Sequence, residues 1–269
     1  MFTLSLNRLG VIKLSEPVNM RIKKTVLYGP NGGGKSTIIR ALIVLLVRNE
    51  SCRYHLLYEV ERDHKILVKL IEGADLKLCS NSTCIDFGGG GLGEYRVARI
   101  AGDILRQCGA MGQINIHDND ELKAIVENPA FVEKFEEFFR WREPDIERFY
   151  YGYFKEKVGG WLELQFLPYG YKKTLLILYA LEQNDIVLIE GFENALHLDL
   201  MRELLDYIDE NYSNKVIVIE THNGLPLTWG VKKNWSVYYV WRDNVVELHT
   251  LKDLHETELF VKELEAMKI

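Results

Sequence analysis

Gly29-Pro30-Asn31-Gly32-Gly33-Gly34-Lys35-Ser36-Thr37 is the stretch that decides the fold of this chain. It matches the pattern G-x-x-x-x-G-K-[ST] of a phosphate-binding loop, or P-loop. Residues 24–28 before it have the composition of a strand, and residues 37–47 after it form an almost wholly apolar run typical of a buried helix. A strand, a glycine-rich loop and a helix in this order predict an α/β domain built around a phosphate site.

The loop predicts a binding site for ATP with Mg²⁺. Backbone N–H groups of a glycine-rich turn point inward and surround a polyphosphate, and the start of the following helix adds partial positive charge. We expect Lys35 to reach the β- and γ-phosphates and the hydroxyl of Ser36 to bind Mg²⁺. The predicted nucleotide-binding residues of the loop are Gly29, Pro30, Asn31, Gly32, Gly33, Gly34, Lys35, Ser36 and Thr37.

The composition suits a cytoplasmic α/β protein. The 269 residues are 47% hydrophobic, and the formal net charge is −6. A negative surface is not built to hold nucleic acid, and the small basic groups at Arg21, Lys23 and Lys24 and at Lys232 and Lys233 are more simply interpreted as solvated side chains. Neither a signal-peptide pattern nor an apolar run of about 18 residues occurs, so we expect no membrane segment.

The cysteines carry a separate expectation. The four cysteines at positions 52, 79, 84 and 108 form no C-x-x-C pair. This spacing predicts neither a zinc site nor a secreted disulfide framework. We therefore expect reduced thiols, as is usual in the cytosol.

The pattern along the chain divides it into three parts. Residues 1–92 are expected to form an N-terminal lobe with the P-loop and a β-subdomain. Residues 93–143 are predicted to be a helical insert, and residues 144–269 a C-terminal α/β lobe. Because apolar strands alternate with helices, we expect a largely parallel sheet that is covered on both faces.

Finer features follow from the same pattern. A strand is predicted where Ile66, Val68 and Leu70 share one face and Lys65 and Lys69 the other. The four glycines at 88–91 predict a flexible loop, and a second phosphate cradle is the less favoured alternative because no Lys-Ser follows. Residues 131–138 place three phenylalanines on one helix face, a stripe that is most often core and less often an interface. The other predicted elements are short strands over 2–28, a β-rich stretch over 53–86, strands near 147–154 and 161–166, a helix over 171–181, a hairpin over 235–248 and a final helix over 251–265.

Two further strands end in groups that suit nucleotide chemistry. Residues 185–190 form an apolar strand that ends in Glu190, and residues 215–220 form another that is followed by His222. Mg²⁺ in a P-loop protein is held by the loop hydroxyl and by an acid at the tip of a neighbouring strand. The predicted metal ligands are therefore Ser36 and Glu190.

The order of these motifs resembles that of the ABC-type ATPases, in which a P-loop, a long insert, a signature loop, a Walker B strand and a switch histidine follow one another. Within that class the chain resembles the chromosome-maintenance and overcoming-lysogenization-defect branch, with its motifs G-P-N-G-x-G-K-S, D-E-x-E-N-x-L-H and T-H-S. The matching stretches here are Gly29–Ser36, Glu190-Gly191-Phe192-Glu193-Asn194-Ala195-Leu196-His197 and Thr221-His222-Asn223. The resemblance implies an ATPase head that binds ATP and Mg²⁺ and forms a nucleotide-dependent homodimer or joins a partner subunit.

The chain departs from that pattern at three places, the first being Glu190, which stands at the position of the Walker B aspartate. Gly191 stands where the family carries its catalytic glutamate, so Glu193 and His222 are the predicted catalytic residues, with Glu193 either a base or a structural hydrogen-bond partner. The signature loop keeps its second glycine, Gly170, but has Tyr169 in place of the first. The resemblance implies that Gly170 faces the nucleotide of a second subunit.

Three functions compete on these residues. The first is a slow, Mg²⁺-dependent ATPase that acts as a nucleotide-driven switch or clamp, for example in DNA repair or defence. The second is a nucleotide-binding interaction module whose hydrolysis has decayed, which Gly191 favours. The third, a small-molecule kinase, is disfavoured by His222 and by the spacing from Gly170 to Glu190.

Overall fold

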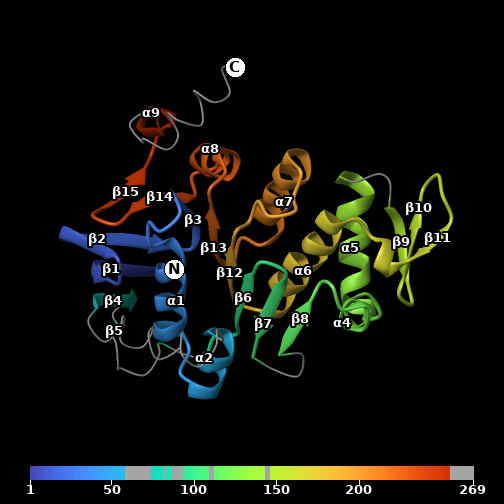
Figure 1. Cartoon of the computed structure of the whole chain (residues 1–269), viewed down its shortest axis with the longest axis horizontal. Helices are drawn as coiled ribbons and strands as arrows, with labels where there is room; N and C mark the ends of the chain where they lie inside the picture. Colours follow the sequence, from blue (N-terminus) through green and yellow to red (C-terminus); the bar gives the residue numbers. More distant parts are fainter. Residues whose placement is uncertain are drawn as a thin grey trace.

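The computed structural model describes residues 1–57, 74–81, 83–86, 92, 94–108, 112–142 and 146–254. Among these residues, the central sheet has eight strands in the order β15-β14-β3-β13-β12-β6-β7-β8 (Figure 1). Five neighbouring strands, from β14 to β6, run parallel, and antiparallel strands extend both edges. The bounds are β3 (Lys24–Tyr28), β6 (Val97–Ala101), β7 (Ile104–Gln107), β8 (Gln113–Asn115), β12 (Ile186–Glu190), β13 (Val216–Thr221), β14 (Ser236–Trp241) and β15 (Asn244–Leu248).

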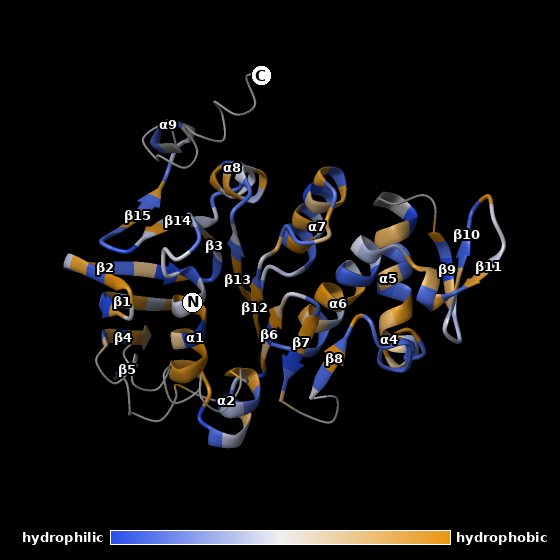
Figure 2. Cartoon of the chain, viewed as in Figure 1, coloured by the Kyte–Doolittle hydropathy of each residue, from blue (hydrophilic) through white to orange (hydrophobic). Residues whose placement is uncertain are grey.

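Both faces of the central sheet are buried, which is why its strands are apolar along their length. Leu188 of β12 belongs to the cluster on the side of helix α1 (Lys35–Leu46), whereas Val187 and Ile189 belong to the cluster on the opposite side. That opposite side is covered by α6 (Tyr169–Gln183), α7 (Leu198–Asn211) and α8 (Gly224–Lys232), whose buried hydrophobic residues belong to the same cluster. Figure 2 shows that hydrophobic and hydrophilic residues alternate along these helices. The predicted parallel and covered sheet is confirmed.

A smaller antiparallel sheet packs over α1. It consists of β1 (Phe2–Leu9), β2 (Ile12–Ile22), β4 (Asp75–Ser80) and β5 (Thr83–Asp86), in the order β2-β1-β4-β5. The inward side chains of β1 alternate along the strand and join the α1 cluster. This sheet is the predicted β-subdomain. The helix that follows α1, α2 (Glu50–Leu57), continues to the edge of the central sheet beside β7.

The other end of the molecule combines two helices with a three-stranded sheet. Helices α4 (Asn119–Val126) and α5 (Pro129–Arg142) lead into β9 (Ile146–Tyr150), β10 (Tyr153–Glu156) and β11 (Trp161–Glu163), followed by a turn of 3-10 helix at Leu164–Phe166. Phe131, Phe135 and Phe138 of α5 are buried, so the phenylalanine stripe is core. No helix of the described ranges is long and apolar enough to cross a membrane.

The predicted helical insert over 93–143 is wrong in its first half, whose described residues hold the strands β6, β7 and β8. Strands β6 and β7 form a hairpin, in which Ala101 pairs with Ile104, and β6 pairs with β12 in the central sheet. The turn is Gly102-Asp103, and Gly102 has a φ of 59°, a conformation that glycine adopts without steric cost. A two-residue turn with glycine between apolar runs is a hairpin pattern, and it outweighs the helical periodicity there. Helix begins at Asn119.

Three other expectations need comment. The β-rich stretch predicted over 53–86 begins inside helix α2, and its first strand of the described residues is β4. The alternating residues 66–70 and the glycines at 88–91 lie outside the described residues. Of the final helix predicted over 251–265, the described part is α9 (Leu251–Leu254).

The expectation of reduced thiols is also wrong, because the structure pairs all four cysteines. Cys79 and Cys84 lie opposite each other on the hairpin of β4 and β5. Cys52 of α2 bonds to Cys108 beyond the end of β7, across a sequence separation of 56 residues. Spacing alone could not show the second pair, since it depends on α2 packing against β7.

Candidate nucleotide site

The P-loop joins β3 to α1 at the carboxyl end of the parallel strands, where ligands of α/β sheets bind. Two of its glycines are required by geometry. A Cβ atom on Gly29 would lie 2.3 Å from the carbonyl oxygen of Val240 on β14. Gly34, just before α1, has a φ of 111°, and a Cβ there would meet the side chain of Ile12 at 2.6 Å. The loop is therefore pressed between β14 and the tip of the β1–β2 hairpin.

Lys35 is the first residue of α1, and it is 3% exposed. Its Nζ donates to the carbonyl oxygens of Gly29 at 2.8 Å and Pro30 at 3.0 Å. Burial lowers the pKa of Lys35, and the neighbouring carboxylate of Glu220, 3.7 Å away, acts in the opposite direction. The ammonium group is thus held over the loop, at the place where a bound polyphosphate would lie.

Glu220 is a site residue to which the sequence analysis assigned no role. It is the fifth residue of β13 and is 6% exposed. The hydroxyl of Ser36 donates to both of its carboxylate oxygens, at 3.1 and 3.0 Å. Burial and the charge of Glu190 raise the pKa of Glu220, while Lys35 opposes that rise. The pattern that could have revealed it is a carboxylate at the end of an otherwise apolar, buried strand.

Glu190, the predicted metal ligand, lies at the end of β12 and is engaged by an arginine. Its Oε1 accepts a hydrogen bond from Nε of Arg99 at 2.6 Å. The Arg99 side chain is 2% exposed, and it also donates from Nη1 to the carbonyl oxygen of Leu56 at 3.0 Å. The carboxylate bonded to Ser36 is therefore that of Glu220, whereas Glu190 forms a buried ion pair with Arg99.

Glu193 and His222, the predicted catalytic residues, are in direct contact. Glu193 accepts from the Thr221 hydroxyl at 2.8 Å and from the backbone N–H of His222 at 2.9 Å. Nδ1 of His222 lies 2.8 Å from the Gly29 carbonyl oxygen and 3.3 Å from Lys35 Nζ. Burial and the charge of Lys35 lower the pKa of His222, so the ring is neutral near pH 7. Glu193 thus fixes the strand end that carries the histidine.

The loop with Gly170 is held against the chain's own sheet. Tyr169 donates its hydroxyl to Asp103 in the β6–β7 turn, and the ring of His117 stacks on Tyr169 and also bonds to Asp103. The buried Lys173, one turn along α6, donates to the Gly102 carbonyl oxygen, and burial lowers its pKa to about 8. These contacts fix the start of α6, where Gly170 lies.

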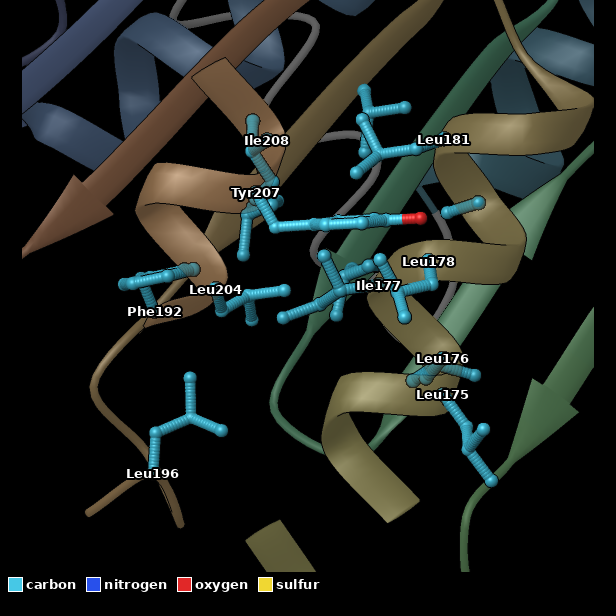
Figure 3. Packing of buried hydrophobic residues seen from close by; sticks show 14 of the residues in the cluster. Leu175, Leu176, Ile177, Leu178, Leu181, Phe192, Leu196, Leu204, Tyr207 and Ile208 are labelled. Atoms are coloured by element: carbon cyan, nitrogen blue, oxygen red, sulfur yellow. The ribbon is translucent and has the colours of Figure 1, made fainter. Parts of the chain in front are cut away.

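Helices α6 and α7 pack against each other beside the loop that contains Gly170. Leucine and isoleucine side chains of α6 pack against Leu204 and Ile208 of α7 (Figure 3). A Cβ on Gly170 would lie 2.8 Å from the Ala195 carbonyl oxygen in the turn that precedes α7. The other motif residue of that turn, His197, is exposed and caps α7 by accepting from the backbone N–H of Asp199.

A cavity of about 260 Å³ opens over the P-loop. Its walls carry an ammonium group, hydroxyl groups and a carboxylate, the groups that suit a phosphate with a divalent cation. Its lining residues are Val11, Asn31, Gly32, Gly34, Lys35, Ser36, Thr37, Arg40 and Glu220. The cavity therefore fits the phosphate end of a nucleotide together with Mg²⁺.

The small basic groups lie away from this cavity and are largely matched by acids. Arg21 pairs with Glu247 at 2.5 Å, and Lys24 pairs with Asp209 at 2.8 Å. Lys233 lies 3.3 Å from a carboxylate oxygen of Asp206. These three pairs reduce the positive charge that Arg21, Lys24 and Lys233 offer to a nucleic-acid backbone.

Comparison with known proteins places the fold. Residues 106–227 match the family model AAA_21, described as "AAA domain, putative AbiEii toxin, Type IV TA system". No curated protein matches the chain. The structure is similar to the SMC head domain from Thermotoga maritima, with a TM-score of 0.52 and 15% identity over 92% of this chain and 98% of that one.

ATP-binding cassettes of ABC transporters are similar to the same extent. One in its ADP conformation gives a TM-score of 0.54 and 13% identity over 97% of this chain and 98% of the cassette. A bacterial Atm1-family ABC exporter with ATP bound gives 0.55 and 15% identity over all of this chain and 42% of the exporter. At these identities the likeness establishes the fold alone, a mixed α/β fold of the ABC-cassette and SMC-head type.

Proposed function

We propose that this chain is a Mg²⁺-dependent ATP-binding protein with slow hydrolysis that acts as a nucleotide-driven switch or clamp. The observation that carries the proposal is the cavity over the P-loop, in which Lys35, Ser36 and a buried carboxylate converge. The ammonium group of Lys35 suits the phosphates, and the Ser36 hydroxyl and the carboxylate suit Mg²⁺. The ABC-type fold supports the same reading.

Lys35 changes partners when nucleotide binds. Its Nζ now donates to the carbonyl oxygens of Gly29 and Pro30, and phosphate oxygens would replace them as stronger, charged acceptors. Ser36 and the carboxylate of Glu220, to which its hydroxyl donates, would hold Mg²⁺, which would neutralise phosphate charge during transfer. His222 would stay close to the same phosphate, since its ring already contacts the loop at Gly29.

Hydrolysis needs a group that orients water, and Glu193 is the proposed one. Its carboxylate is tied to Thr221 and to the backbone of His222, so it is well placed but shares both oxygens with other donors. Gly191 leaves the position next to Glu190 without a carboxylate. Slow turnover, or turnover that a partner completes, follows from this arrangement.

The clamp half of the proposal rests on Gly170. The start of α6 would direct its positive end at the γ-phosphate bound by a second subunit, so ATP would join two heads, or a head and a partner, and hydrolysis would release them. The family model that matches residues 106–227 names a toxin of a type IV TA system in its description, which supports defence as the setting. DNA repair is the other proposed setting.

A second function is favoured by one observation, the hydrogen bonds that occupy both oxygens of Glu193. A glutamate that serves as a structural partner leaves a nucleotide-binding interaction module without turnover. Single-turnover hydrolysis of radiolabelled ATP separates the two functions. If the parent cleaves ATP and Glu193→Gln slows that cleavage, the ATPase is supported. If the parent binds ATP tightly and does not cleave it, the interaction module is supported.

Binding itself is tested by thermal unfolding with Lys35→Met, which keeps the apolar stem and removes the ammonium group. ATP with Mg²⁺ at about 100-fold over Kd should stabilise the parent by about 2.7 kcal/mol. For a chain of this length that equals a rise in Tm of about 5 °C. Lys35→Met should fold, judged by circular dichroism, and show no rise. A parent with no ATP-dependent shift, or a variant with the full shift, would remove the basis of the proposal.

A further inference from the structure

We propose that Glu220, and not the Walker B residue Glu190, is the carboxylate that binds the metal ion at Ser36, and that Arg99 holds Glu190 away from this role. The inference rests on the proposed function, since the metal would arrive with the nucleotide. It changes which strand supplies the acid: β13, next to the P-loop strand, in place of β12.

Sheet order gives Glu220 the shorter reach. Strand β13 pairs directly with β3, the strand that enters the P-loop, and Glu220 pairs with Leu27 in that register. Strand β12 lies one strand farther from β3, on the other side of β13. Neighbouring strands are about 4.8 Å apart, so the backbone of Glu190 starts about that much farther from the loop than that of Glu220.

The distances at Ser36 already match those of a metal site. Its hydroxyl lies 3.1 and 3.0 Å from the two carboxylate oxygens of Glu220. Octahedral Mg²⁺ binds oxygen at 2.0–2.1 Å, so two neighbouring ligand oxygens lie ~2.9 Å apart. A metal ion could therefore bind between these groups with little movement of either side chain, while the Ser36 hydroxyl keeps its proton and turns it away from Glu220.

Glu190 is occupied by a contact that is costly to break. Arg99 is buried to 2% exposure of its side chain and bonds to Glu190 at 2.6 Å. Moving Glu190 to a metal would break this buried ion pair, and the guanidinium group cannot lose its proton to compensate. Arg99 is itself fixed through the Leu56 carbonyl oxygen, so it cannot simply follow the carboxylate.

The charges at the strand ends also support a metal ion at Glu220 and not at Glu190. Glu190 and Glu220 end neighbouring strands, one register step beyond the pair Ile189 and Ile219. Two carboxylates so placed repel each other unless cations lie beside them. Arg99 neutralises Glu190, while Lys35 lies 3.7 Å from Glu220 and turns to phosphate when nucleotide binds. Glu220 is then the carboxylate that lacks a counter-ion, which a divalent cation supplies.

The test measures metal binding directly, with Mn²⁺ as the probe. Free Mn²⁺ is followed by electron paramagnetic resonance during titration of the protein saturated with ADP, a nucleotide that it cannot hydrolyse. Glu220→Gln should weaken Mn²⁺ binding roughly tenfold or more, the loss found even for groups that only support a metal ligand. The matched variant Glu190→Gln keeps an oxygen acceptor for Arg99 and should change Mn²⁺ affinity less than about threefold.

A double variant protects the test against misfolding. If Glu190→Gln unfolds, Arg99→Met with Glu190→Leu removes the whole ion pair and keeps apolar bulk, and it should still bind Mn²⁺ like the parent. Loss of Mn²⁺ binding in Glu190→Gln or in this double variant, or parent-like binding in Glu220→Gln, would overturn the assignment. If the parent binds ADP and the variants give one of these contrary results, the metal assignment alone is refuted. If the parent binds no nucleotide, the proposed function is refuted as well.

Discussion

The buried ion pair between Arg99 and Glu190 gives the sharpest stability prediction. The Arg99 side chain is 2% exposed and that of Glu190 12%, with 2.6 Å between their bonded atoms. Replacing Glu190 by Leu breaks the buried ion pair, which costs about 3–5 kcal/mol for pairs of this kind. Unfolding entropy of about 2.1 cal/mol/K for each of 269 residues gives ~0.56 kcal/mol/K. The variant should therefore melt about 5–9 °C below the parent.

A double-mutant cycle, read by calorimetry and denaturant unfolding without nucleotide, tests the pairing. Arg99→Met should also lower the free energy of unfolding, because it leaves a carboxylate in a largely buried site and the Leu56 carbonyl without its donor. The double variant should be more stable than the sum of the single losses predicts, by about 1–3 kcal/mol. Losses that simply add would show that the two side chains do not interact, and the reasoning about Glu190 would fail with them.

Four further predictions follow from the site and the fold. Glu193→Gln should slow single-turnover hydrolysis by ~10²-fold or more with ATP affinity unchanged; equal rates would leave Glu193 a structural residue. ATP, but not ADP, should dimerise the Glu193→Gln protein in light scattering, and adding Gly170→Asp should prevent it; a monomer under all conditions would contradict the clamp. Burial lowers the pKa of Lys173 to about 8, so between pH 8 and 10 the unfolded chain binds more protons than the folded one, and the free energy of unfolding should rise with pH. Lys173→Met should lose that rise, and profiles of Tm against pH that run parallel for parent and variant would refute the prediction. Reduction of the Cys52–Cys108 bond, which closes 56 residues, should lower stability by about 4 kcal/mol and Tm by about 7 °C; Cys52→Ser should reproduce the loss in unreduced protein.

The local sequence was sufficient to predict those elements whose structure is determined by residues close together in the chain. The P-loop, the apolar strand that ends at Glu190 and the histidine after β13 could be placed because each combines a short pattern with its neighbouring element. The same held for the phenylalanine stripe of α5, whose period of three and four is a property of the helix alone. It failed at residues 97–107, because the hairpin there is fixed by pairing with β12.

The sequence by itself determined the class of fold and the location of the phosphate site, because glycines, a lysine and a hydroxyl at fixed spacing act through one continuous loop. Tertiary structure decided which acid meets Ser36, and why Arg99 matters. Glu220 and Glu190 both stand at the ends of apolar strands, and the sequence motif around Glu190 favoured the acid that does not meet Ser36. The order of strands in the sheet sets Glu220 beside the P-loop and Glu190 beside a buried arginine, and that order arises from contacts between segments far apart in the chain.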